Sequence, residues 1–144
     1  MIYKAQKADA AIVAELAAKL WPSAAANNLV EEFCEFLNQD DSAIFLYIIN
    51  NIPAGFAQCQ LRRDYVEGTE TSPVGYLEGV YVEPEHRNRG YGKKLVLACE
   101  EWARSKGCTE FASDCELHNT DSLAFHLHSG FTEANRIICF TKRL

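Results

Sequence analysis

Two stretches near the N-terminus carry apolar residues at the three- and four-residue spacing of an amphipathic helix. The first follows Asp9, a residue suited to capping a helix, and ends at Trp21-Pro22, because proline disfavours helical geometry in the residue before it. The second is closed by the polar residues 38–41. We therefore expect a short strand at 2–6 and two helices. Their buried faces would be formed by Ile12, Val13, Leu16 and Leu20 and by Leu29, Val30, Phe33, Phe36 and Leu37.

Apolar runs typical of strands occupy the middle of the chain. Residues 43–50 and 54–61 are separated only by Asn51-Ile52-Pro53, a connection of the length that antiparallel neighbours use. A polar loop without apolar periodicity follows at 62–73, long enough to carry function. Residues 74–82 then predict a third strand of this region.

Helical and strand patterns alternate in the rest of the chain. We expect a helix over 91–106 with Gly107 at its end, a strand over 109–117, a short helix over 119–129 and a last strand over 135–142. A strand, a helix and a second strand in this order indicate a parallel crossover. The whole pattern predicts the α/β class, with a mixed central sheet covered by helices on both faces, in one domain over residues 1–144.

The net charge of the chain limits the kinds of molecule that it is expected to bind. The chain has 14 Lys and Arg against 20 Asp and Glu, a formal net charge of -6, which repels nucleic acid unless a basic surface overcomes it. No apolar run approaches the roughly 20 residues that span a bilayer, and the N-terminus has no signal-peptide pattern. We expect a cytoplasmic protein without nucleic-acid or membrane partners. The one basic cluster suits a single small anion and consists of Arg87, Arg89, Lys93 and Lys94.

The six cysteines form no C-x-x-C pair, and most have apolar neighbours in the sequence. This distribution favours reduced thiols in the core over disulfides or metal ligands. His126 and His128 are two residues apart, so they would face apart on a helix and cannot form a metal pair. We expect no metal site.

Residues 86–95, HRNRGYGKKL, join the strand at 74–82 to the helix that follows. Gly90 and Gly92 let the backbone approach a ligand, and the unpaired N–H groups at a helix start attract an anion. A turn with a solvated basic face would explain Gly-x-Gly alone. The longer spacing R-x-x-G-x-G favours a phosphate cradle.

This R-x-x-G-x-G segment resembles the motif with which the GCN5-related N-acetyltransferase superfamily holds the pyrophosphate of acetyl-coenzyme A. Asn119, with Gly130-Phe131 eleven residues later, is similar to a second motif of the superfamily, and the order of elements is similar over essentially the whole chain. The resemblance implies that fold, acetyl-coenzyme A as cosubstrate and backbone pairing of its pantetheine arm with the strand. It assigns to the cofactor Val80, Tyr81, Val82, Arg87, Asn88, Arg89, Gly90, Tyr91, Gly92, Lys93 and Asn119.

Two carboxylates are candidates for binding a cationic acceptor. Strict alternation along the strand puts Glu78 on one face with three apolar neighbours, Tyr76, Val80 and Val82. A carboxylate there requires a partner, unless that face is solvated. Asp114 lies near the end of the neighbouring strand. We expect the two carboxylates to border a cation-binding mouth.

The segments GYLEGVYVEPEHR and EEWARSKGCTEFASDCELHNTDSLAFH are similar, more closely, to the aminoglycoside 6'-N-acetyltransferase branch of the superfamily. That similarity implies acetylation of the 6'-amino group of aminoglycoside antibiotics, which confers resistance. It makes Trp21, Tyr65, Glu78 and Asp114 the candidates for substrate contact. Simple core packing explains Trp21 equally well, whereas Tyr65 lies in a polar loop with little core to fill.

The resemblance implies direct attack of a neutral amine on the thioester, with Glu78 taking the amine proton and a backbone N–H near Val80 stabilising the oxyanion. Many members carry a tyrosine seven residues after the motif asparagine, placed to protonate the departing thiolate. Here that position is His126, which is either this acid or a packed helix residue. The candidate catalytic residues are therefore Glu78 and His126.

The resemblance and the apolar last strand, which could pair across a subunit boundary, favour a homodimer. The same strand could instead close the sheet of a single chain. Two alternatives to the aminoglycoside function stay open. One is an acetyltransferase for another cationic amine, such as a polyamine or a peptide, and the other is a coenzyme A-binding protein without turnover.

Overall fold

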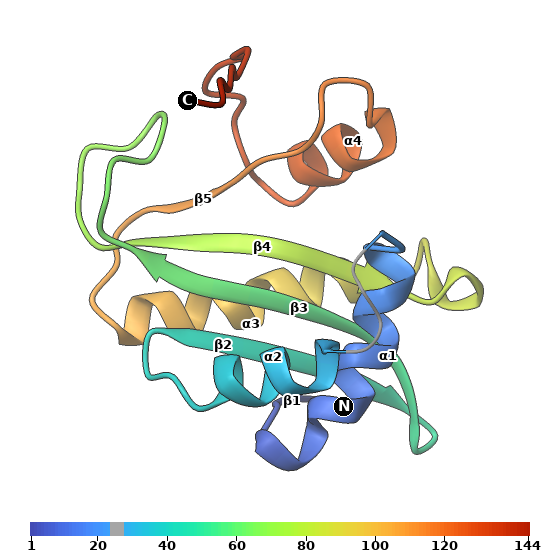
Figure 1. Ribbon diagram of the computed structural model, residues 1–144. Coiled ribbons are helices and arrows are strands. Elements are labelled where there is room, and N and C mark those ends of the chain that lie inside the picture. The colour runs from blue at the N-terminus through green and yellow to red at the C-terminus, as the bar shows by residue number, and fades with distance from the viewer. Residues whose placement is uncertain (24–27) are drawn as a thin grey trace.

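Five strands form one sheet in the order β1-β2-β3-β4-β5 in the computed structural model, which describes residues 1–23 and 28–144 (Figure 1). The first four strands are antiparallel to their neighbours, and β5 is parallel to β4. The predicted mixed sheet is confirmed. The strands are β1 (Ile2–Lys4), β2 (Ser42–Ile49), β3 (Ile52–Arg62), β4 (Val74–Val82) and β5 (Phe111–Ser113).

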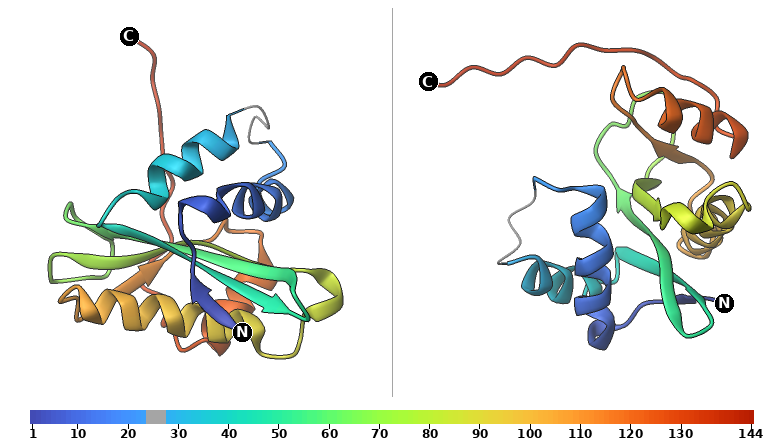
Figure 2. Two further views of the ribbon diagram at one scale, coloured as in Figure 1. Left: turned by 90° about the horizontal axis from the view of Figure 1, so that it is seen from below. Right: turned by 90° about the vertical axis from the view of Figure 1, so that its right-hand side faces the viewer.

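Helices cover both faces of this sheet, as predicted. Figure 2 shows α1 and α2 on one face and α3 on the other. The apolar residues of α1 and α2 form one core cluster with Ile44, Leu46 and Phe56, and those of α3 form a second cluster with the opposite face of the sheet. The helices are α1 (Ala10–Leu20), α2 (Leu29–Leu37), α3 (Tyr91–Ser105) and α4 (Thr120–His128), with 3-10 turns at η1 (Lys7–Asp9) and η2 (Pro84–His86).

Two local predictions require correction. Asp9 does not cap α1 with its side chain; it is paired with Gln6 in a capping box around η1. The connection between β2 and β3 is also tighter than expected, because Ile52 already pairs with Ile49. Asn50 and Asn51 form the turn with φ of 50° and 64°, a left-handed conformation that asparagine tolerates and that matches the twist of a hairpin.

The expected last strand at 135–142 is wrong. The structure gives residues 132–144 neither helix nor strand, and this segment runs away from the body of the chain (Figure 2). Ile137, Ile138 and Phe140 are 66%, 81% and 87% exposed as a result. The strand expected over 109–117 is likewise only three residues long, because its pairing with β4 ends at Ser113.

A bulge in β4 overturns the predicted alternation along that strand. Gln58 and Cys59 lie opposite Gly79 and Leu77, so Glu78 has no partner residue in β3. The extra residue reverses the faces beyond it. Val80 and Val82 pack in the cluster beneath α3, whereas Tyr76 lies in a separate small cluster with Val66 and Val74. Glu78 therefore does not share an apolar row with Val80 and Val82.

The cysteines follow the expectation in part. Cys59, Cys99 and Cys108 are buried and free in the α3 cluster, and burial raises the pKa of the Cys99 and Cys108 thiols. Cys115 and Cys139 are exposed instead. Within the described residues, none of the helices has the length and apolar character needed to cross a bilayer.

We expect the two isoleucines at opposite extremes of burial to differ sharply in their contribution to stability. Ile44 is fully buried between β2 and the α1–α2 layer, and Ile52 at the start of β3 is 64% exposed. Ile44→Ala should lower the free energy of unfolding by about 2 to 5 kcal/mol, because it leaves a cavity. Ile52→Ala should change it by less than about 1 kcal/mol. Urea titration of both variants measures this, and equal losses would contradict the described core.

Candidate functional site

The site begins where β4 and β5 part. The two strands pair only through Gly75, Tyr76 and Leu77 of β4, and the last of these is opposite Ser113 (Figure 1). Beyond that point β4 continues to Val82, while the chain after Ser113 leaves the sheet. Over residues 78–82, apart from the bulged Glu78, β4 still pairs with β3 on one side, but no strand among the described residues pairs with its other side. We call this unpaired side of β4 the open edge. An extended ligand could add to it as a further strand.

The bulge directs Glu78 toward a polar cluster at the beginning of the open edge. Its Oε1 atom accepts hydrogen bonds from Gln60 Nε2 at 2.6 Å and from Arg62 NH2 and Nε at 2.8 and 3.2 Å. The carboxylate is thus not merely solvated; it has the partners that a half-buried charge requires. Among the described residues no donor reaches Oε2 by hydrogen-bond criteria, so one carboxylate oxygen stays available.

Arg62 connects this carboxylate to the second one. Its guanidinium carbon lies 3.5 Å from the centre of the Tyr76 ring, and the Tyr76 hydroxyl donates to Asp114 Oδ2. Burial, and then the hydrogen bond to Asp114, raise the pKa of Tyr76 far above its usual value. The phenol therefore stays protonated and keeps donating. Glu78 and Asp114 do border one polar cluster, in which Arg62 and Tyr76 link the two carboxylates.

Trp21 and Tyr65 occupy different surroundings. Trp21 ends α1 and packs edge-on against Phe56, with ring centres 6.1 Å apart. A Cβ on Gly79 would come within 2.6 Å of the Trp21 ring, so the missing side chain lets the indole lie on the strand next to Glu78. Tyr65 is 79% exposed in the loop after β3. Trp21 thus packs in the core and also borders the open edge, whereas the Tyr65 side chain is mostly exposed to solvent.

The predicted phosphate loop joins β4 to α3. Gly90, the residue before α3, has φ of 80°, a conformation that other residues adopt with strain, and no atom lies within 4 Å of a Cβ built there. Arg89 and Lys93 are exposed beside it. The loop thus offers uncovered backbone N–H groups at a helix start together with cationic side chains. Such an arrangement is suited to holding a phosphate group.

Other residues of this loop have structural partners. Arg87 Nε donates to the carbonyl oxygen of Val82 at 2.8 Å, and Tyr91 stacks on Tyr47 with ring centres 4.5 Å apart. A Cβ on Gly92 would lie 2.8 Å from the Phe125 ring, so Gly92 lets α3 and α4 approach closely. Gly90 and Gly92 therefore serve different purposes. Asn88 also has a left-handed φ of 61°.

Asn119 begins α4, where its Oδ1 accepts from the Ser122 N–H at 3.1 Å. This cap leaves the Asn119 amide nitrogen free of hydrogen bonds to the described residues. The nitrogen can donate to a ligand along the open edge. One side chain would thus fix the helix start and contact the cofactor.

His126 lies on α4 with both ring nitrogens engaged. Nε2 is 2.8 Å from Ser113 Oγ, and Nδ1 is 2.7 Å from the carbonyl oxygen of Ser122. The ring also contacts Phe125 and Phe131, with centres 5.9 and 5.2 Å away. His126 is therefore packed and polar at once, and its Nε2 atom points toward the last paired residue of β5.

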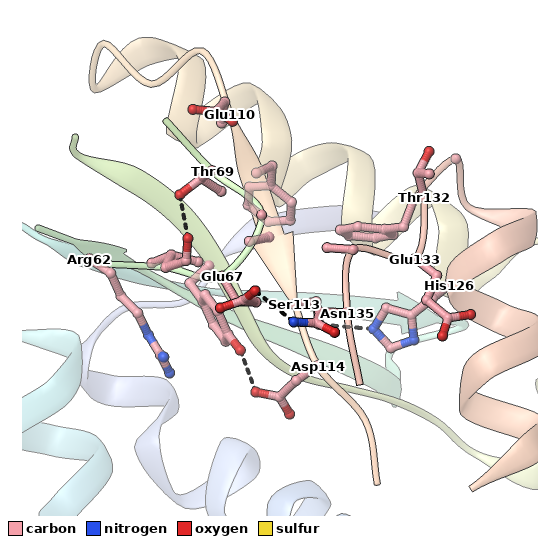
Figure 3. A pocket seen from close by; sticks show the side chains of 18 of the residues that line it. Arg62, Glu67, Thr69, Glu110, Ser113, Asp114, His126, Thr132, Glu133 and Asn135 are labelled. Carbon is pink, nitrogen blue, oxygen red and sulfur yellow. Dashed lines mark hydrogen bonds between the residues drawn. The ribbon is translucent and has the colours of Figure 1, made fainter. Parts of the chain in front are cut away.

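A cleft of about 1140 Å³ lies beside β5, between the loop after β3, α4 and the C-terminal segment (Figure 3). It brings together Tyr65, Asp114 and His126 from the sequence-based candidates, with Arg62, Tyr76 and Ser113 in addition. Glu78 and Trp21 are not part of its lining. His126 and Ser113 point toward each other in Figure 3, and Asp114 accepts the hydrogen bond of the Tyr76 hydroxyl.

Sequence reasoning missed Gln60, Arg62, Tyr76 and Ser113. The signal for Gln60 and Arg62 was their alternation at the end of β3, which puts both on the face of Glu78 once the strands are in register. The Tyr76–Asp114 and Ser113–His126 contacts depend on where β4 and β5 separate. No group of three or more potential metal ligands occurs in the part of the chain that the structure describes.

Comparison with known proteins identifies relatives of the whole chain. The model of the acetyltransferase (GNAT) family matches residues 10–131. The aminoglycoside N(6')-acetyltransferase type 1 of Stenotrophomonas maltophilia is 41% identical over 140 residues, which cover 96% of this chain and 90% of that protein. The enzyme of the same name from Salmonella typhimurium is 39% identical over 87% of this chain and 86% of its own length.

Solved structures agree with these relatives. Aminoglycoside N-acetyltransferase AAC(6')-Iy in complex with coenzyme A has a TM-score of 0.96 and 36% identity, over 100% of this chain and 95% of that one. The same enzyme with the bisubstrate analogue CoA-S-monomethyl-acetylneamine also gives a TM-score of 0.96 at 36% identity, over 100% and 98% of the two chains. An AAC(6')-IG structure from Acinetobacter haemolyticus, without ligand, has a TM-score of 0.94 at 37% identity, over 100% and 99%.

We expect the Arg62–Glu78 ion pair to contribute measurably but modestly to stability. The two side chains are 38% and 21% exposed, so solvent weakens their attraction. A double-mutant cycle with Arg62→Gln and Glu78→Gln should give a coupling energy of about 1 kcal/mol at low salt, decreasing in 1 M sodium chloride. The more exposed pair of Arg63 and Asp41, with side chains 58% and 53% exposed, is the control and should couple more weakly. A zero coupling for Arg62 and Glu78 would contradict the described contact.

Proposed function

This chain belongs to the acetyltransferase (GNAT) family, and we propose that it transfers the acetyl group of acetyl-coenzyme A to the 6'-amino group of aminoglycoside antibiotics. Acetylation removes a positive charge from the drug and so confers resistance. The observation that carries this proposal is the open edge of β4, which begins at Glu78 and has the phosphate loop at its far end. Relatives named for this activity match nearly the full chain, which supports the assignment.

The acetyl donor would lie along the open edge. Main-chain groups of Val80, Tyr81 and Val82 are available to the pantetheine arm, because β5 has already left the sheet. The pyrophosphate would bind at the start of α3, on the backbone of residues 87–93, and the amide of Asn119 would contact the arm. The thioester would then lie near the bulge at Glu78.

The acceptor would approach from the face that carries α1. Glu78 and Asp114 each use one oxygen for a partner within the protein, Oε1 and Oδ2 respectively, and keep the other available for an ammonium group. Trp21 and Tyr65 would contact the sugar rings. The net charge of -6 increases the local concentration of a polycation before it binds.

The chemistry is direct transfer within a ternary complex. The neutral 6'-amine attacks the thioester carbon, and a backbone N–H near Val80 stabilises the oxyanion. Glu78 Oε2 takes the amine proton, directly or through a water molecule. Because acetyl-coenzyme A is a cytoplasmic metabolite, we place this reaction in the cytoplasm.

The proposal predicts which substrates release coenzyme A. We expect rapid thiol release with kanamycin or tobramycin and little with spermidine or a peptide. Asp114→Asn and Glu78→Gln should each lower kcat/KM for the drug at least about tenfold, because a broken ion pair at such a site typically costs about 2 to 5 kcal/mol. Glu31→Gln on the exposed surface of α2 is the matched control and should keep normal kinetics.

Rapid turnover with peptides or spermidine, and none with any 6'-amino aminoglycoside, would refute the acceptor and leave the family assignment intact. Saturable binding of coenzyme A without turnover of any amine would instead support the binding-protein alternative.

We further propose a homodimer in which the C-terminal segment 132–144 pairs with the partner chain. Its apolar residues Ile137, Ile138 and Phe140 are exposed in a single chain, at an energetic cost that burial would remove. The edge of β5 that faces away from β4 has no partner strand among the described residues. An unpaired edge and an unpaired apolar segment within one molecule favour exchange between two copies.

Sedimentation tests this assembly. We expect a dimer at micromolar concentration, and Ile138→Ser with Phe140→Ser should shift it toward monomer, since the exchanged strand would lose apolar contacts. The exposed Ile52→Ser at the β2–β3 turn is the control and should leave the dimer unchanged. A wild-type protein that sediments only as a monomer would exclude the assembly.

A further inference from the structure

Ser113 occupies the position at which the sheet opens. It is the last residue of β5 to pair with β4, opposite Leu77. Phe111, two residues earlier on the same strand, packs in the cluster with α3, together with Val80 and Val82 of the open edge. Side chains two residues apart share a face of a strand. The Ser113 hydroxyl thus lies on the α3 and α4 side, opposite to the face of Asp114 and Tyr76.

The hydrogen bonds around Ser113 constrain where the protons are. Ser113 Oγ lies 3.1 Å from the carbonyl oxygen of Leu77 and 2.8 Å from His126 Nε2. His126 Nδ1 lies 2.7 Å from the carbonyl oxygen of Ser122, which can only accept, so Nδ1 carries a proton. The serine hydroxyl has one proton to give. If it goes to Leu77, the 2.8 Å contact requires a second proton on His126, at Nε2.

Two protonation states of His126 are compatible with its contact to Ser113. With an imidazolium, Nδ1–H donates to Ser122, Nε2–H donates to Ser113, and the serine donates to Leu77. With a neutral imidazole, the serine donates to Nε2 instead, and Leu77 loses that donor. The two states differ by one proton, which enters or leaves through the Ser113 hydroxyl. A hydroxyl between a histidine and an opening in the sheet has the connectivity of a proton relay.

His126 itself has no free polar atom to offer to a ligand. Both ring nitrogens are engaged, and Phe125 and Phe131 lie against the ring. Ser113 is therefore the polar group that stands between His126 and the beginning of the open edge. In this geometry His126 would supply the proton, and the Ser113 hydroxyl would be the group that contacts the reacting atoms.

We propose that Ser113 is a further catalytic residue, which passes a proton from His126 to the sulfur atom of coenzyme A as the acetyl group leaves. This inference rests on the proposed acetyl transfer. As the amine nitrogen forms its bond to the acetyl carbon, the carbon–sulfur bond breaks and its electron pair stays on sulfur. The Ser113 hydroxyl proton moves to that sulfur, and Oγ takes the Nε2 proton of the imidazolium.

The products of this step are a neutral thiol and a neutral His126 that still donates from Nδ1 to Ser122. The proton lost by the amine leaves on the opposite face, through Glu78 or water, and His126 regains its proton from solvent. Amine deprotonation and thiol protonation are thus assigned to different faces of the sheet. General acid catalysis of this kind typically contributes about 10²- to 10⁴-fold.

The test compares two substitutions of nearly equal volume that differ in the hydroxyl. Ser113→Thr keeps it and Ser113→Val removes it, and both residues suit a strand. The measurements are the single-turnover rate of acetyl transfer to kanamycin with both substrates saturating, the coenzyme A dissociation constant and the melting temperature. Ser105→Ala is the control, because the Ser105 hydroxyl also donates to a main-chain carbonyl, that of Trp102, away from the site.

We expect Ser113→Thr to stay within about threefold of wild type and Ser113→Val to lose at least about tenfold in the transfer rate, with coenzyme A affinity unchanged. The loss in Ser113→Val should not deepen when His126→Phe is added, since the two residues act as one unit. Equal rates for the Thr and Val variants would overturn the relay. A loss in Ser113→Val that is matched by weaker coenzyme A binding would also overturn it. Wild-type turnover in the same assay tests the proposed function separately.

Discussion

The extra residue in β4 is the feature on which the rest of the site depends. Without the bulge at Glu78, side chains would alternate strictly along β4, and Glu78, Val80 and Val82 would share one face of the sheet. Either the carboxylate would then lie against the apolar cluster beneath α3, or the two valines would lie in the polar cluster. With it, the strand is polar before the bulge, on the α1 face, and apolar after it, on the α3 face. In the proposed function, the same stretch of chain would contact a charged acceptor on one face and an acyl donor on the other.

The separation of β4 from β5 leaves the backbone at this bulge accessible to a ligand. The pairing ends one residue before Glu78, at Leu77 and Ser113, so the first unpaired backbone groups belong to the bulged segment. Polar networks flank the point on both sides. Gln60, Arg62, Tyr76 and Asp114 form the network around Glu78, on the face proposed for the acceptor, and Ser113 and His126 form the other. Most of the titratable groups described here are tied to a partner, which keeps them oriented before any ligand binds.

Patterns of the sequence predicted the helices and the order of the strands, because the apolar periods are regular and each element has a clear end. These patterns failed where the conformation of a strand depends on which other strand it pairs with. The bulge at Glu78 appears only in the register with β3, and residues 135–142 pair with no strand among the described residues. Among the site residues, the loop at 87–93 was visible as a motif, whereas Ser113 was not. The alternation of Gln60 and Arg62 becomes informative only with the register of β3 against β4.

We propose that acetyl transfer occurs at the point where β4 and β5 part. The most direct measurement is a crystal structure of the protein with coenzyme A. We expect the pantetheine arm to lie along residues 80–82 and the sulfur atom to lie within about 4 Å of Ser113 Oγ, the range of a hydrogen bond to sulfur. An arm that lies away from residues 80–82, with its sulfur remote from both Ser113 and Glu78, would contradict this position.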